Sequence, residues 1–169
     1  MSTNDSPRLV FHAHQRLQPA IVAARNVPLD ARDSYGVAEA DNSVAIATHG
    51  PAIAGMFRDE VWQAFRLGEL YGINDAATNQ PAVRNPFLSP LPNAPVDATV
   101  PLLIERGVQF IVCNVAVRNL SRKLAGNGDA DAIHAQLLAG VIPGATVVPN
   151  VYVSLSHAQQ RGVSYIYID

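Results

Sequence analysis

The chain has 169 residues, of which 49% are hydrophobic and 15% are charged, so one domain with a substantial core is expected and disorder of the bulk of the chain is not. A formal net charge of -2 and the lack of a Lys/Arg cluster argue against a nucleic-acid partner. No apolar run approaches the roughly 18–20 residues that cross a bilayer, so no membrane partner is expected.

The cysteine content and the first residues predict a cytoplasmic location. A single cysteine, Cys113, cannot form an intramolecular disulfide, which is typical of a reducing compartment. Residues 1–7 are polar and lack a basic region leading into an apolar one, so they do not resemble a secretory signal. Few charges and abundant alanine and valine also lead us to expect a homo-oligomer.

Short apolar runs rich in β-branched residues, each bounded by turn formers, predict five strands, at 9–14, 43–48, 108–113, 145–148 and 163–168. Helical patterns fill the gaps between the strands, at 17–24, 59–70, 97–106 and 114–124, and Asp97 is expected to cap the third of these helices. Two further helices are predicted: one capped by Asp129 or Asp131, and one that begins at Asn150 and ends at Gly162. Strands that alternate with helices predict an α/β fold with helices on both faces of a mostly parallel sheet. No domain boundary is evident over residues 1–169.

A long loop at about 72–96 interrupts this pattern. It holds five of the twelve prolines and shows little periodicity. A loop of this length inside a domain is usually functional or disordered. Arg84, Asn85 and Phe87 form a basic, amide and aromatic set suited to covering a pocket. The alternative is a packed segment that joins subunits or shields a sheet edge.

Histidines and the cysteine fall at the carboxyl ends of the predicted strands, where parallel sheets bind their ligands. His12 and His14 end the first strand, His49 ends the second, Cys113 ends the third, and Asn150 follows the fourth. His134 and His157 fall inside helical segments and are expected to be packing or surface residues.

Cys113 has the strongest chemical case. It directly precedes Asn114, which begins a predicted helix, and the free N–H groups of a helix N-terminus stabilise a thiolate. A nearby imidazolium, for instance that of His49, would lower the thiol pKa further. The alternative is that Cys113 is a buried cysteine acting as a small hydrophobe.

His49 lies in the sequence Thr-His-Gly-Pro, where Gly50 lets the backbone approach a ligand and Pro51 suits a first helical position. A helix beginning here would favour an anion or a polarised sulfur. His12 and His14, two apart on a strand, could join His49 or Cys113 in a metal site. No compact ligand spacing or nucleotide-binding motif supports a metal or another cofactor, so none is expected.

The sequence resembles the DsrE/DsrF-like superfamily of sulfur-relay proteins from about Leu9 to Ile168. The resemblance rests on the order of four segments, 44–52, 107–114, 143–149 and 160–166, and Arg84-Asn85-Pro86-Phe87 resembles a loop insertion of one subgroup without a settled activity. The resemblance implies a three-layer α/β/α fold and assembly into trimers or hexamers. It also implies that Cys113 carries sulfur as a persulfide exchanged with a donor or acceptor protein.

These observations lead to a first hypothesis of a DsrE-like, sulfurtransferase-like sulfur carrier with Cys113 and His49 as its catalytic residues. Gly50, Asn114, Arg84 and Asn150 are its expected ligand-binding residues. The alternative is a non-catalytic oligomeric module that holds a small anion, thiol compound or metal in the strand-end pocket around His49. A third hypothesis is a scaffold with an inert, buried cysteine.

Overall fold

Five parallel strands form one sheet in the order β4-β3-β2-β1-β5 within residues 8–169, which are the residues that the computed structural model describes. The strands are β1 (Arg8–Ala13), β2 (Ser43–Thr48), β3 (Gln109–Cys113), β4 (Ala145–Val148) and β5 (Ser164–Ile168). They lie where the apolar runs predict them, so the expectation of a mostly parallel five-stranded sheet is confirmed. The prediction that residues 1–7 are no secretory signal lies outside the described residues.

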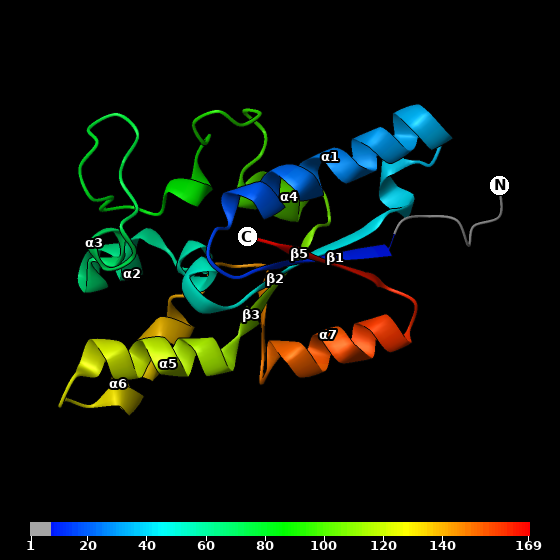
Figure 1. Ribbon diagram of the computed structural model, residues 1–169. Helices are drawn as coiled ribbons and strands as arrows, with labels where there is room; N and C mark the ends of the chain where they lie inside the picture. The colour runs from blue at the N-terminus through cyan, green and yellow to red at the C-terminus, as the bar shows by residue number, and fades with distance from the viewer. Residues whose placement is uncertain (1–7) are drawn as a thin grey trace.

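Helices cover both faces of the sheet and give the expected three-layer α/β/α fold (Figure 1). On one face lie α1 (Gln18–Tyr35) and α4 (Val100–Glu105), and on the other lie α5 (Asn114–Ala125), α6 (Ala130–Ala139) and α7 (Val151–Gln160). The short helices α2 (Asp59–Phe65) and α3 (Leu67–Tyr71) lie beyond the sheet on the side of the carboxyl ends of the strands. Three 3₁₀ segments complete the described elements: η2 (Glu39–Asp41), η3 (Gly50–Met56) and η4 (Pro86–Leu88).

The core lies on both sides of the three central strands, because a parallel strand covered by helices on two faces needs apolar side chains throughout. Phe11, Ile46 and Phe110 are each at most 3% exposed. The edge strands differ: Val147 in β4 and Tyr167 in β5 are exposed. No helix of residues 8–169 is long and apolar enough to cross a membrane.

Two predicted helices have different bounds in the structure. The segment predicted at 17–24 is the start of α1, which continues to Tyr35 with Pro19 in its first turn and Pro28 inside it. The segment predicted at 59–70 is divided into α2 and α3 at Arg66, whose φ of 49° interrupts the helix.

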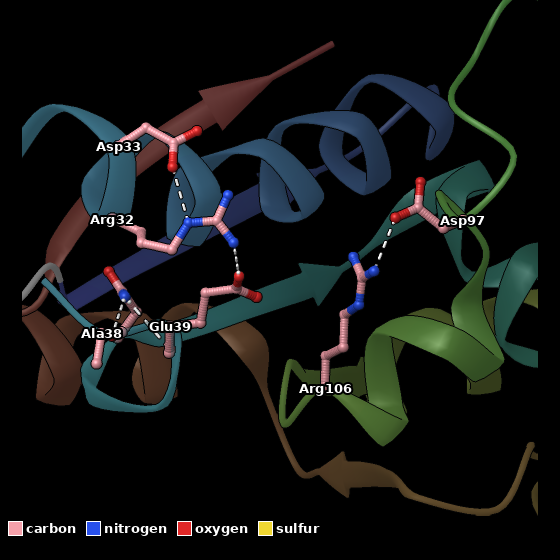
Figure 2. A network of polar contacts seen from close by, with 7 residues as sticks. Arg32, Asp33, Ala38, Glu39, Asp97 and Arg106 are labelled. Atoms are coloured by element: carbon pink, nitrogen blue, oxygen red, sulfur yellow. Dashed lines mark hydrogen bonds and ion pairs between the residues drawn. The ribbon is translucent and has the colours of Figure 1, made fainter. Parts of the chain in front are cut away.

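The prediction that Asp97 caps a helix is wrong. The hydroxyl of Thr99 accepts from the backbone N–H of Leu102 and caps α4. Asp97 instead forms ion pairs with Arg25 (3.0 Å) and Arg106 (2.8 Å), the second of which is drawn in Figure 2. Two guanidinium partners offer the carboxylate stronger hydrogen bonds than a backbone N–H does.

The segment 72–96 is only partly packed against the domain: Ala82, Asn85, Phe87 and Leu91 are buried, whereas residues 74–81 are exposed. The side chain of Asn85 donates to the backbone oxygens of Gly55 and Phe57 and accepts from the N–H of Phe87. Asn85 and Phe87 are buried, and the side chain of Gln18 in α1 donates to Pro92 O. These contacts fix the segment beside the start of α1.

Strand order and register decide which side chains meet at the carboxyl edge. β1 lies between β2 and β5, with Ala13 opposite Thr48 and His12 opposite Tyr167. Residues that follow β1 and β2 are therefore neighbours of the last residues of β5, although more than a hundred positions separate them along the chain.

Candidate functional site

Three histidines converge at the carboxyl ends of β1 and β2. Since Ala13 pairs with Thr48, His14 and His49 are the next residues on adjacent strands. Their rings are stacked, with centroids 5.2 Å apart and an interplanar angle of 21°, and the ring of His12 lies 6.1 Å from that of His49. The turn is held by backbone hydrogen bonds from His49 N to Ala13 O and from Ala52 N to His14 O.

Tyrosines from β5 and α7 surround His12. The register places Tyr165 and Tyr167 opposite Val10 and His12, and a hydrogen bond of 2.9 Å joins Nδ1 of His12 to the hydroxyl of Tyr165. The centroid of the Tyr152 ring, in the first turn of α7, lies 5.7 Å from that of His12 and 5.1 Å from that of His49. The histidines are thus covered by aromatic rings rather than by charged partners.

Burial lowers the pKa of His12, and the neighbouring His49 and His14 lower it further, against a smaller opposing effect of Asp169. Burial and then His14 lower the pKa of His49 in the same way. Both imidazoles are therefore neutral near pH 7, each with one N–H donor and one acceptor nitrogen.

Two ring nitrogens in this cluster are buried and unpaired. Of the residues described, none forms a hydrogen bond with Nε2 of His12 or with Nδ1 of His49. His12 as a whole is 3% exposed. Buried polar atoms are rarely left without a partner, and those that are often mark a place where a water or ligand atom binds.

An open cleft of about 330 Å³ begins beside this cluster. The walls are formed by the strand-end residues His14, His49, Gly50 and Pro51, by Tyr71, and by Ala116, Asn119, Leu120 and Lys123 of α5. Lys123 also lies over the ring of Tyr71, with Nζ 5.8 Å from the centroid. Lys123 is the only one of these lining residues with a full formal charge, and none is acidic, so the formal charge of the lining is positive.

Gly50 is required for the position of His14. Its φ is +56°, and a Cβ atom built on it would lie 2.5 Å from Cδ2 and 2.6 Å from Nε2 of the His14 ring. Real Cβ atoms do not approach so closely, so His14 stacks on His49 only because residue 50 has no side chain. Gly50 thus belongs to the site, through its contact with His14.

Cys113 is at the expected place in the fold but is not exposed. It ends β3 and is the N-cap residue of α5, and Val112 pairs with Thr48, so Cys113 and His49 follow paired positions. Its side chain is 1% exposed and belongs to the apolar core. This burial is what the alternative interpretation of Cys113, a buried cysteine that acts as a small hydrophobe, predicts.

The other predicted ligand-binding residues lie outside the cleft. The side chain of Asn114 accepts a hydrogen bond of 2.7 Å at Oδ1 from Nε2 of His134. Arg84 is 84% exposed and pairs with Asp59 at 3.0 Å. Asn150 caps α7 by accepting from the N–H of Tyr152, as its local sequence predicts. The predicted helix after His49 is the 3₁₀ segment η3.

The sequence analysis missed Lys123, Tyr71 and the three tyrosines around His12. Lys123 belongs to no local motif, and nothing in the sequence near it connects it with His49. The alternation in Ser-Tyr-Ile-Tyr-Ile puts Tyr165 and Tyr167 on one face of β5, a usable signal once the strand order is known. Within residues 8–169 no three His, Cys, Asp or Glu side chains are arranged to hold a metal ion.

No family model and no curated protein matches the chain. A structural search finds the solved structure of a protein of unknown function, MTH1491 from Methanobacterium thermoautotrophicum. The two share 15% sequence identity with a TM-score of 0.51, over 96% of this chain and 100% of that one. At this identity the similarity shows the fold alone, and the resemblance to the DsrE/DsrF-like superfamily stays a prediction.

Proposed function

We propose that the chain binds a small anion in the cleft between η3 and α5. The observation that carries this proposal is the cleft wall, where the stacked pair His14 and His49 faces Lys123 and no lining residue is acidic. A cation and imidazole N–H groups are donors suited to a carboxylate, phosphate or sulfate oxygen. The unpaired Nδ1 of His49 adds a polar atom that lacks a partner in the described structure.

Anion binding fits this geometry better than sulfur transfer because access to the two sites differs. The cleft is open, whereas the thiol of Cys113 is sealed in the core. Thiol exchange requires a thiolate that a second sulfur can reach. This proposal corresponds to the alternative hypothesis from the sequence, a non-catalytic module that holds a small ligand in the strand-end pocket around His49.

The test is a titration with sodium acetate and with sodium sulfate, in which binding is measured from the backbone and histidine NMR signals. Sodium chloride is used to keep the ionic strength constant. Lys123→Met should weaken binding about three- to tenfold, because it removes one charge at a partly solvated site. His49→Ala should also weaken it. The matched controls are Arg118→Met, on the exposed face of the same helix, and His157→Ala, on α7.

Shifts confined to His14, His49 and α5 that depend on Lys123 would support the proposal. Equal affinities for wild type, Lys123→Met and Arg118→Met would refute it, since binding would then come from the general surface charge.

Sulfur relay at Cys113, with DsrE/DsrF-like membership, is the second candidate. It is supported by the position of Cys113 at the N-terminus of α5 and by its register with His49. In this reaction the Cys113 thiolate attacks the outer sulfur of a donor persulfide, a new S–S bond forms, and the donor leaves as a thiolate. The protein incubated with such a donor should gain the mass of one sulfur, and Cys113→Ser should not. No gain in wild type would exclude it.

We also propose that the chain forms a homo-oligomer and that it is located in the cytoplasm. Self-association is supported by exposed aromatic and aliphatic side chains on the edge strand β5 and the start of α7, namely Tyr152, Val153, Tyr165, Ile166 and Tyr167. Large exposed apolar patches often mark interfaces. Analytical ultracentrifugation of wild type and Tyr167→Asp tests this, with Tyr35→Asp on α1 as the control. A wild-type monomer at high protein concentration would contradict it.

A further inference from the structure

A second, larger groove adjoins the histidine cleft. It has a volume of about 910 Å³ and lies between the start of α1, η3 and the residues that follow α3. Its apolar walls are Leu17, Val22, Ala23, Ala52, Ile73 and Phe87. This volume is in the range of about 300–1,000 Å³ that is usual for cavities holding small organic molecules.

The two cavities share part of their lining. Pro51 and Tyr71 line both of them, so the cavities border on each other at these two side chains. Burial raises the pKa of Tyr71 to about 12, so the shared wall is uncharged. Lys123 lies above this ring, at the histidine end.

The two cavities differ in the charge of the residues that line them. The histidine end has Lys123, which is not paired with a carboxylate among residues 8–169. In the larger groove Arg16 is the only lining residue with a full charge, and its guanidinium already donates to the backbone oxygen of Asp169. A ligand that fits both therefore has a negative head and an uncharged, mainly apolar body.

The walls of the larger groove are held in place without a ligand. Phe87 is fixed by the hydrogen bond of its N–H to Asn85, whose amide is itself bonded to Gly55 O and Phe57 O. Gly55 lets Leu17 and Phe87 pack closely, since a Cβ on it would lie 2.2 Å and 3.0 Å from atoms of these side chains. A preformed groove of this kind loses little entropy on binding.

We infer that the anion bound by this chain is an organic carboxylate with an extended apolar body, whose head lies at His14, His49 and Lys123 and whose body fills the groove beside α1. This inference rests on the proposed function and specifies its ligand class.

The experiment compares straight-chain carboxylates, from acetate through butanoate and hexanoate to octanoate, by NMR titration of the full chain at monomeric ligand concentrations. Each methylene group that enters the groove should tighten binding about threefold, so octanoate should bind at least about 100-fold more tightly than acetate. Octylamine, which has the same chain and the opposite charge, should bind far more weakly than octanoate.

Two substitutions separate the head from the body. Lys123→Met should weaken binding of every carboxylate by a similar factor. Ala23→Phe, which narrows the groove from α1, should weaken octanoate at least tenfold and leave acetate unchanged. Ala125→Phe, at a half-buried alanine of α5 that lines neither cavity, is the matched control.

The outcomes distinguish the two claims. If acetate binds with the expected dependence on Lys123 and octanoate binds no more tightly, the proposed function stands and the inference is overturned. If octylamine binds as well as octanoate, the groove takes apolar chains without an acidic head and the inference is also overturned. If sulfate binds and no carboxylate does, the inference alone is overturned, and if neither sulfate nor a carboxylate binds, both are overturned. The comparison of chain lengths uses wild-type protein, so a variant that fails to fold does not affect it.

Discussion

Replacing Gly50 with alanine tests the geometry of the histidine cluster directly. The methyl group would meet the His14 ring at 2.5 Å, about 1 Å closer than carbon atoms at van der Waals contact. His14 is half-buried, so its ring has room to swing toward solvent. The expected structural result is that His14 leaves the cleft and no longer stacks on His49.

The cost has two parts. An L-residue in the left-handed region loses about 1–2 kcal/mol, of which the lower entropy of the unfolded chain returns about 0.4–1 kcal/mol. Loss of the ring contact between His14 and His49 adds about 0.5–1.5 kcal/mol. Gly50→Ala should therefore lower the free energy of unfolding by about 0.5–3 kcal/mol.

Gly36→Ala is the matched control. Its φ of +67° carries the same backbone strain, but nothing lies within 4 Å of the added Cβ atom. It should lower the free energy of unfolding by the backbone part alone, about 0–1.6 kcal/mol. Urea unfolding gives both values, and the histidine ring signals report the position of His14 independently of stability.

Equal destabilisation by the two substitutions, with the His14 and His49 ring signals of Gly50→Ala unchanged from wild type, would refute this reasoning. It would mean that the His14 ring does not lie against Gly50 in solution. If the His14 ring lies against Gly50, acetate should also bind more weakly to Gly50→Ala than to the wild type. Gly36→Ala should bind acetate as tightly as the wild type does.

Two further predictions concern Cys113 and pH. Native Cys113 should react with an alkylating reagent only as fast as the core opens, so urea should accelerate the reaction by orders of magnitude; fast alkylation in native buffer would contradict its burial. The folded-state pKa values of His12, His49 and His134 lie below their ordinary value of 6.5, so the unfolded chain binds more protons as the pH falls. The contribution of these histidines to the free energy of unfolding should therefore be fully present above 6.5 and should be lost as the pH falls below that value. His12→Asn should reduce this pH dependence, and an unchanged dependence would contradict the lowered pKa of His12.

Local signals in the sequence predicted the elements well. The five apolar runs match the strands, and Asp129 and Asn150 cap α6 and α7 as their positions predict. Where a local signal failed, a distant partner was the reason. Asp97 has the residue type of an N-cap, but Arg25, seventy-two positions away, lies within 3.0 Å of it and Thr99 takes the cap.

The site was only partly predictable. That His12, His14 and His49 lie at strand ends follows from the sequence, but their convergence depends on β1 lying beside β2 in the Ala13–Thr48 register. Lys123 was missed because its distance to the histidines is set by the packing of α5 on the sheet. The burial of Cys113 depends equally on what covers its face of the sheet.

The sequence by itself determined the α/β architecture, the strands and the caps of α6 and α7, because hydrophobic periodicity and backbone capping act between residues that are close along the chain. Only the tertiary structure decided the strand order, the aromatic side chains around His12, the cleft lined by Lys123 and the burial of Cys113. These depend on contacts between residues far apart in the chain, whose free energies no local pattern records.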